Sequence, residues 1–312
     1  MAKTIYLRVD VDFHVGLERG VPYLLKLLAS CRAKATFFVV MGPDTLHRHA
    51  RRLHEPKFRR RLVALDLWRI ARRLGPAYLR SRWRKVDVAT GCPHILRAIG
   101  AHGHELGVHG FDHADWADRC FEMTDAETVE HMDRAFAAFE KLVGQRATAW
   151  AAPNWRANSH MLRHLPRARI HYSSDCRGAG PFSPITDGAA STVPQIPVTL
   201  PCLHELVQVG IPAAKIPAVF ERCLTSETNV WCVHDYYEGL LNRGLFKSVL
   251  DSLHTKGFEI RPLGELAARL DPAKLASDTL VAGEVPGGAR PISCQALFRD
   301  ENYFHQLETA SV

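Results

Sequence analysis

The stretch Thr4-Ile-Tyr-Leu-Arg-Val-Asp-Val-Asp12 is a hydrophobic run that begins almost at the N-terminus and ends in two acidic residues. The apolar part of the run predicts a buried strand. Side chains stop alternating where a strand ends, so carboxylates one residue apart can converge there on one spot. We therefore expect Asp10 and Asp12 to mark a polar site at the end of this strand.

Strand-like and helix-like segments alternate along the rest of the chain. Apolar, β-branched or aromatic runs typical of short strands lie at residues 35–40, 105–108, 147–152, 170–174, 229–233 and 258–261. Helical patterns lie at residues 21–31, 93–99, 124–143, 245–254 and 263–270, and Thr124 with Glu127 fits a capping box. This alternation predicts an α/β fold with a parallel sheet.

Ionisable and polar residues follow most of these strands. Asp10 and Asp12 follow the first, and later strands are followed by His109, Pro153–Arg156, Asp175 and His234. The carboxyl ends of parallel strands form one rim, where active sites are built. Taken alone, Asp175 also suits a turn and His234 a buried core histidine. Their shared position after strands favours a catalytic site.

The spacing His-x-x-x-His occurs twice, at His109/His113 and at His160/His164. With 17 histidines in 312 residues, chance alone gives about one such pair. The first pair is preferred because it follows a strand and a strand-end Asp pair can complete it, whereas the second lies on a predicted helix. One Asp and two His form a ligand set for a divalent metal and leave the other Asp free as a base.

Positive charge is concentrated in the segment 46–86. This segment holds 14 Lys and Arg residues and two acids, a net charge of +12, whereas the whole chain carries +7. Residues 58–74, drawn as one helix, place most apolar side chains on one arc, and a second basic, aromatic piece follows Gly75-Pro76. Such a helix suits an anionic membrane surface. The alternatives are packing of its apolar face on the main fold, or nucleic acid binding, which is disfavoured because no nucleic-acid motif is present.

Size and composition fit a single large α/β domain or two small ones, with a 46% hydrophobic fraction that allows a sizeable core. No apolar run is long enough to span a bilayer. Without a secretory leader at the N-terminus, we expect the protein to remain in the compartment where it is made. The eight cysteines form no Cys-x-x-Cys pair, which predicts buried thiols.

In this order, the residues above resemble the polysaccharide deacetylase superfamily, also called NodB-homology or carbohydrate esterase family 4. Ser174-Asp-Cys-Arg-Gly178 and Pro194-Gln-Ile-Pro-Val-Thr-Leu-Pro201 resemble one branch, the 4-deoxy-4-formamido-L-arabinose-phosphoundecaprenol deformylases. The resemblance covers nearly the whole chain. It implies a distorted (β/α) barrel of about seven strands. Residues 1–270 would form this deacetylase domain, including the basic helical insertion 46–86, and residues 271–312 an irregular tail.

The resemblance also implies roles for individual residues. Asp12, His109 and His113 would hold the divalent metal ion, and two His with one carboxylate suit Zn, Co, Ni, Fe or Mn. Asp10 would be the general base and His234 the general acid.

Two further roles follow, one of them at a departure from the family pattern. Asp175 would be the orienting partner of His234. The family usually has an Arg before the Pro of its third motif to steady the base, but here Ala151-Ala152 precede Pro153. Arg156 is the nearest substitute.

The implied function is removal of a formyl group from an undecaprenyl-phosphate-linked amino sugar in lipid A modification and polymyxin resistance. The enzyme would be peripheral, on the cytoplasmic side of the inner membrane, held there by residues 46–86. One alternative is a deacetylase of a polyprenyl-phosphate-linked N-acetylhexosamine or another N-acetylated glycan. Another is a non-catalytic glycan- or lipid-binding protein, which the intact set of Asp and His residues disfavours.

Overall fold

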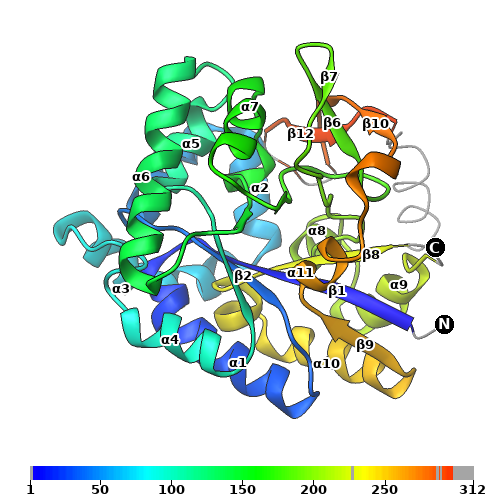
Figure 1. Ribbon diagram of the computed structural model, residues 1–312. Helices are drawn as coiled ribbons and strands as arrows, with labels where there is room; N and C mark the ends of the chain where they lie inside the picture. Colours follow the sequence, from blue (N-terminus) through cyan, green and yellow to red (C-terminus); the bar gives the residue numbers. More distant parts are fainter. Residues whose placement is uncertain (1–2, 226–227, 286–287, 289, 298–312) are drawn as a thin grey trace.

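A curved parallel sheet forms the centre of the molecule in the computed structural model, which describes residues 3–225, 228–285, 288 and 290–297 (Figure 1). Its strands run in the order β5-β4-β3-β2-β1-β8, and β9 also pairs with β1. The bounds are β1 Lys3–Val11, β2 Thr36–Val39, β3 Glu105–Val108, β4 Ala149–Trp150, β5 Tyr172–Ser173, β8 Asn229–His234 and β9 Phe258–Arg261. The seven parallel strands confirm the predicted (β/α) architecture.

The two faces of β1 have different neighbours, because side chains alternate along a strand. Ile5, Leu7 and Val9 belong to the larger hydrophobic core, which includes residues of the covering helices. Tyr6 belongs to a second, smaller core inside the curved sheet. Arg8 and Asp10 share the period of Tyr6, so they face the inside of the barrel.

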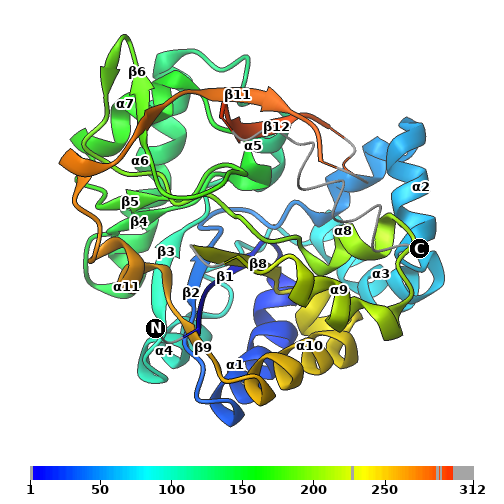
Figure 2. The same ribbon diagram turned by 90° about the vertical axis from the view of Figure 1, so that its right-hand side faces the viewer.

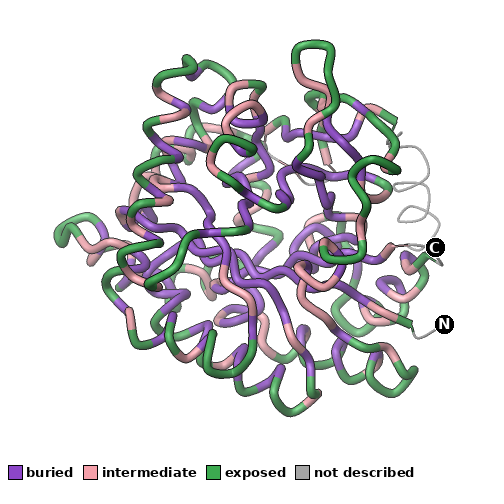
Figure 3. Tube along the Cα trace, in the orientation of Figure 1, coloured by how far each residue is buried: buried purple, intermediate pink, exposed green. Residues whose placement is uncertain are grey.

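Helices cover the outside of the sheet, and Figure 3 shows the central strands buried beneath more exposed outer segments. These helices are α1 Val21–Ser30, α4 Pro93–Ala101, α5 His113–Arg119, α6 Asp125–Val143, α7 Ser159–Arg167 and α10 Arg243–Thr255. Helix α11 Leu263–Ala267 instead packs on the smaller core, through Leu263 and Leu266. The predicted capping box at the start of α6 is confirmed, since Thr124 and Glu127 bond each other's backbone N–H reciprocally.

The basic insertion folds as a 3-10 helix, η2 Leu46–His54, followed by α2 Pro56–Ala64 and α3 Leu67–Trp83. The prediction of one helix over 58–74 with a break at Gly75-Pro76 is wrong. The break lies at Asp66, which adopts a φ of 68° and caps α3 by accepting a hydrogen bond from the Arg69 N–H. Helix α3 continues through Pro76 instead. The insertion packs beside α8 Leu203–Gln208, as Figure 2 shows.

The tail is not irregular where it is described, contrary to the sequence expectation. Strand β10 Ser277–Asp278 pairs with β6 Ser183–Thr186, and β11 Leu280–Gly283 forms an antiparallel pair with β12 Ile292–Gln295. Ser293 accepts a hydrogen bond from the Ala157 N–H, which ties β12 to the loop after β4. Within the described residues, no helix is both long and apolar enough for a membrane span.

Candidate active site and metal centre

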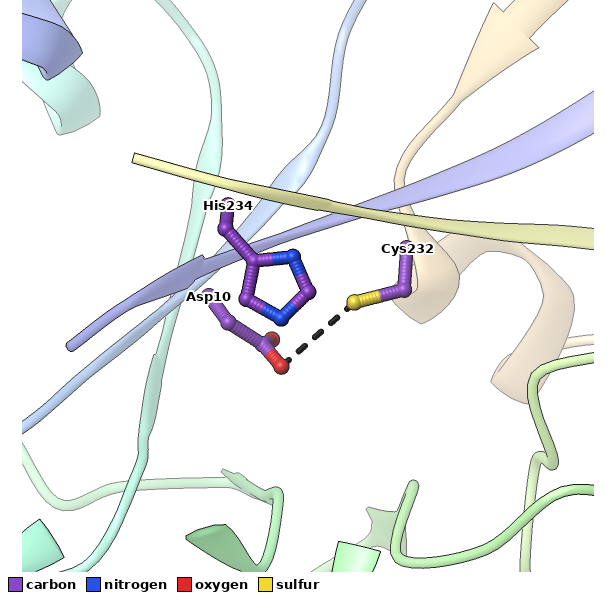
Figure 4. A group of neighbouring side chains, drawn as sticks. All are labelled: Asp10, Cys232 and His234. Carbon is purple, nitrogen blue, oxygen red and sulfur yellow. Dashed lines mark hydrogen bonds between the residues drawn. The ribbon is translucent and has the colours of Figure 1, made fainter. Parts of the chain in front are cut away.

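Strand register brings the proposed base and acid together. Asp10 on β1 is the direct partner of His234 on the neighbouring strand β8. Figure 4 shows both side chains on the same side of these strands, together with Cys232, whose thiol donates to Asp10 Oδ2 at 3.4 Å. The donor atoms of the three residues lie within 4.8 Å of one another. A substrate carbonyl placed here would meet both an acid and a base.

Asp12, His109 and His113 form a second buried cluster at the same rim. Asp12 Oδ1 lies 3.4 Å from His109 Nε2 and 3.6 Å from His113 Nε2. Oxygen and nitrogen donors about 2.1 Å from a shared tetrahedral ion lie about 3.4 Å apart. The three residues expected to hold a metal are therefore brought together at the spacing of metal ligands.

Hydrogen bonding within this cluster also fits a divalent ion. Asp12 Oδ1 is buried and accepts no hydrogen bond, although a buried carboxylate oxygen normally needs a partner. His109 Nδ1 bonds the Ala151 carbonyl at 2.8 Å, so this nitrogen carries the proton and Nε2 keeps its lone pair for an ion. Burial would raise the pKa of Asp12, but His113 and His109 hold it well below its usual range. Asp12 is thus a charged ligand at neutral pH.

Arg8 is the residue that steadies Asp10. Its guanidinium is fully buried and donates two hydrogen bonds to the carboxylate, from Nε to Oδ1 at 2.8 Å and from Nη2 to Oδ2 at 2.6 Å. Nη1 also donates to Ser174 Oγ at 3.0 Å. Burial would raise the pKa of Asp10, but Arg8, with His109, lowers it below its ordinary value. Asp10 is therefore ionised and held in one orientation.

The structure does not support the expected role of Arg156. Its guanidinium donates to the Ala117 carbonyl and lies 4.2 Å from the centre of the Phe121 ring. The bidentate position beside Asp10 belongs to Arg8. Arg156 points elsewhere because it follows the irregular turn after β4, whereas Arg8 lies on the same strand as Asp10.

The expected pairing of Asp175 with His234 is also replaced by other contacts. Asp175 accepts from the Ala152 N–H at 2.7 Å and from Gln195 Nε2 at 2.6 Å, and burial raises its pKa. Its charge also stabilises the Arg8 guanidinium. Among the described residues, Asp175 therefore supports the Arg8 side of the site.

His234 is held mainly by aromatic packing. Its ring lies 5.1 Å from that of His204, 5.6 Å from that of Tyr236 and 5.9 Å from that of Trp155. Its backbone N–H donates to Glu238 Oε2 at 2.7 Å. Burial lowers the pKa of His234, against the opposing charges of Asp12 and Asp10. The ring is thus fixed in position, and its Nδ1 neither accepts nor donates a hydrogen bond within the described structure.

The turn after β4 carries backbone strain where it lines the site. Asn154 and Trp155 both have positive φ, 56° and 48°, although neither is glycine. Such conformations are costly and cluster at functional sites. They place Trp155 between two buried guanidinium groups, 5.9 Å from that of Arg8 and 5.8 Å from that of Arg177. The strain therefore supports the wall against which His234 packs.

A pocket of about 1250 Å³, counted with its open mouth, joins both clusters. The barrel rim contributes ionisable lining residues, namely Asp10, Asp12, His109, His113 and His234, and α8 contributes His204 and Glu205. The insertion contributes mostly apolar ones, namely Leu46, Phe58, Leu62, Leu65, Ile70 and Leu74. The insertion thus packs on the barrel through part of its apolar surface and becomes a wall of the candidate active site.

Sequence reasoning missed two residues of this pocket region. The position of Arg8 could have been predicted from the sequence, because Arg8 lies two residues before Asp10 and strand periodicity places both side chains on one face. The position of His204, on α8, could not have been predicted from the sequence, because only the tertiary fold brings this residue to His234. Of its neighbouring potential ligands, Glu205 is engaged locally, since its Oε2 accepts from the Cys202 backbone N–H at 2.8 Å and lies 3.4 Å from the Arg177 guanidinium.

The remaining sequence candidates have other surroundings. His160 Nδ1 and His164 Nε2 instead form hydrogen bonds at the helix surface with Asp125 and Asp133, at 3.0 and 2.7 Å. All eight cysteines are free, and seven are buried, Cys31 being the partly exposed one. The expectation of unpaired, buried thiols is confirmed for those seven.

Comparisons with known proteins agree with this geometry. A family model described as polysaccharide deacetylase matches residues 2–172. Over 267 residues, the chain is 31% identical to a protein of Shewanella sediminis (strain HAW-EB3) named 4-deoxy-4-formamido-L-arabinose-phosphoundecaprenol deformylase, covering 83% of this chain and 84% of that one. A protein of the same name from Wigglesworthia glossinidia brevipalpis is 29% identical over 258 residues, covering 81% and 88%.

Solved structures show the same fold. A protein from Mycobacterium smegmatis described as a polysaccharide deacetylase superposes with a TM-score of 0.60 at 16% identity, covering 91% of this chain and 96% of that one. The chain therefore belongs to the polysaccharide deacetylase family and is a hydrolase of carbohydrate amide bonds, a deformylase or deacetylase.

Proposed function

We propose that the protein removes the formyl group from a polyprenyl-phosphate-linked 4-formamido-4-deoxy-arabinose in lipid A modification. The observation that carries the proposal is the paired geometry of Asp10 and His234 beside the Asp12, His109 and His113 cluster. The names of the two relatives support the formyl group and the lipid-linked sugar as substrate.

Asp12, His109 and His113 would hold a divalent ion, which supplies Lewis-acid polarisation of the amide carbonyl and a lowered pKa for water. Asp10 accepts a proton from the water that attacks the amide carbon. Arg8 keeps that carboxylate ionised and oriented until the proton transfers.

His234 then donates a proton to the sugar nitrogen as the C–N bond breaks, because an unprotonated amine is a poor leaving group. The new C–O bond leaves the formyl carbon as formate, and the sugar keeps a free amine. The packing of His204, Tyr236 and Trp155 around the ring fixes the direction in which this proton is delivered.

The decisive experiment is mass spectrometry of products from formyl- and acetyl-amino-sugar polyprenyl phosphates. We expect loss of the formyl mass, and faster turnover of the formyl than of the matched acetyl substrate. Asp10→Asn and His234→Ala should each abolish most turnover. Full activity of both variants would refute the assigned roles, and preference for the acetyl substrate would identify a deacetylase instead.

We also propose that the outer surface of the insertion binds an anionic membrane. Trp68, Leu79 and Trp83 are 85%, 57% and 78% exposed. At about 100° per residue, these three side chains lie on one face of α3, within an arc of about 60°. Arg72, which is exposed, falls on the same face of α3. Each cation near an anionic surface contributes about 1 kcal/mol, and interfacial Trp adds to it, so this face suits peripheral attachment.

A further inference from the structure

The thiol of Cys232 lies beside the proposed base and acid, although the proposed reaction does not use it. Cys232, Asp10 and His234 are all buried. The Cys232 thiol donates to Asp10 Oδ2 at 3.4 Å, and Figure 4 shows the three side chains gathered on one side of β1 and β8. One ligand atom from each residue lies within 4.8 Å of the other two. Carboxylate, thiolate and imidazole are the groups that bind zinc in proteins, so these residues form a second possible ligand set.

The spacing within this ligand set fits one shared ion. An oxygen about 2.1 Å and a sulfur about 2.3 Å from a tetrahedral ion lie about 3.6 Å apart. The distance between Cys232 Sγ and Asp10 Oδ2 is 3.4 Å, close to this value. The third ligand atom, from His234, would have to approach by at most about 1.2 Å, the difference between 4.8 Å and the ideal separation. Because His234 Nδ1 has no hydrogen-bond partner among the described residues, no such bond of this nitrogen opposes the shift.

An ion can enter this ligand set without breaking the contacts of Arg8. A carboxylate oxygen has two lone pairs, and Asp10 Oδ2 accepts one hydrogen bond from Arg8 Nη2 at 2.6 Å and one from the Cys232 thiol. The ion takes the place of the thiol proton, in the step Cys–SH + M²⁺ → Cys–S–M⁺ + H⁺. The proton leaves through the pocket, which Asp10 and His234 line. Because the Arg8 charge disfavours a nearby cation, binding requires an ion that bonds strongly to thiolate.

We propose that Asp10, Cys232 and His234 form an inhibitory site for a thiol-binding divalent cation such as Zn²⁺ or Cd²⁺. An ion bound there occupies lone pairs of the proposed base and acid, so neither group can transfer a proton. The site is distinct from the cluster formed by Asp12 and two histidines, which contains no sulfur. Mn²⁺ prefers oxygen ligands, so it should leave the inhibitory site empty. Binding is independent of the proposed function, and only the inhibition rests on it.

Two other cysteines provide matched controls. Cys202, with His204 and Glu205, also brings three kinds of ligand within 4.8 Å. There, however, the sulfur accepts a hydrogen bond from the Arg177 guanidinium at 4.0 Å, whereas the Cys232 thiol donates to a carboxylate. Cys202 is therefore the less favourable ligand for a cation. Cys31 is the partly exposed thiol and controls for binding at an accessible cysteine.

The test is titration of the metal-free full chain with Cd²⁺, followed by equilibrium dialysis and by the ultraviolet absorption of the cadmium–thiolate bond. Two ions should bind to each chain, one of them with this absorption and the other, in the sulfur-free cluster, without it. Cys232→Ser should abolish the absorption and weaken one of the two ions at least about tenfold, because the thiolate ligand is lost. His234→Gln should weaken the same ion. Cys202→Ser and Cys31→Ser should retain both ions and the absorption.

Persistence of the absorption in Cys232→Ser, or its loss in Cys202→Ser, would overturn the assignment. A single bound ion in the wild type would also overturn it, and this result needs no variant. Circular dichroism verifies that each variant is folded, and His234→Gln tests the site without a change to the thiol. Turnover should fall as the absorption rises, so undiminished turnover at full absorption would refute the inhibitory role. Failure of the wild type to release formate would refute the proposed function but leave the cation site intact.

Discussion

Replacing Arg8 with Met should destabilise the protein and disable the base together. Arg8 donates two hydrogen bonds to Asp10, at 2.8 and 2.6 Å, and one to Ser174 Oγ at 3.0 Å, all in the barrel interior. Removing one partner of a buried ion pair costs about 3–5 kcal/mol, because the other charge is left uncompensated. Asp10→Asn alone should have a similar cost. In the double variant neither charge remains, so its cost should fall short of the sum by about 2–3 kcal/mol.

The measurement is a urea-unfolding cycle of the four proteins in excess chelator, so that metal binding adds nothing to stability. Arg156→Met is the matched control, since Arg156 contacts the Ala117 carbonyl and the Phe121 ring. Combined with Asp10→Asn, it should be additive within about 0.5 kcal/mol. Additivity of Arg8→Met with Asp10→Asn, or strong coupling through Arg156, would refute the assignment.

Activity gives a second readout of the same pair. The pKa of Asp10 is lower in the folded protein than in the unfolded chain. Ionised Asp10 therefore stabilises the native state above the unfolded-state pKa, and this stabilisation is lost as the pH falls through the folded-state pKa. Without Arg8, burial is unopposed and the pKa rises. The acidic limb of kcat/KM should then move upward by about 1–3 pH units in Arg8→Met. An unmoved limb would mean that another group sets the charge of Asp10.

Three further perturbations test the rest of the site and the insertion. His113→Ala should lower metal content and turnover at least about tenfold, whereas His164→Ala, on a helix surface, should change neither; elemental analysis and rate assays decide. Glu238 is buried with its pKa raised from 4.5 to about 8, so the native state retains a proton that the unfolded chain loses, and native stability falls as pH rises between these values. Glu238→Gln should therefore gain about 4 kcal/mol relative to wild type between pH 5 and pH 8, and an equal change in both proteins would contradict this. Replacing Trp68 and Trp83 with Ser should reduce partitioning onto anionic vesicles at least about tenfold while leaving turnover of a detergent-solubilised substrate unchanged.

The sequence was most informative where local pattern alone determines position. Asp10, Asp12, His109 and His234 each follow a buried apolar run, and the ends of neighbouring parallel strands must meet at one rim. Their convergence therefore required only correct strand assignments. The capping box of α6 was similarly local, because its partners are three residues apart.

Side-chain partners inside the rim could not be inferred in this way. Arg156 and Asp175 were assigned to the base and acid by position in a motif, but the course of a turn decides where such side chains point. The strained turn at Asn154 and Trp155 directs Arg156 toward Ala117. Arg8 could have been found, because period-2 alternation places it beside Asp10 on one face of β1. A buried arginine two residues before a catalytic carboxylate is therefore a usable signal when the family's usual arginine is missing.

The insertion shows why charge and amphipathicity alone left its role open. A wheel drawn through residues 58–74 assumed one helix, but the positive φ of Asp66 ends α2 and starts α3 in a new direction. Apolar residues that share an arc on one ideal helix are thereby divided, with Leu65 and Leu74 in the pocket and Trp68 at the surface. The two readings weighed from the sequence, packing on the barrel and binding a membrane, are thus not exclusive. The proposed lipid-linked substrate would need both, since its lipid would have to pass from a bilayer to the catalytic rim, and one segment with an apolar surface on each side would provide a short path between them.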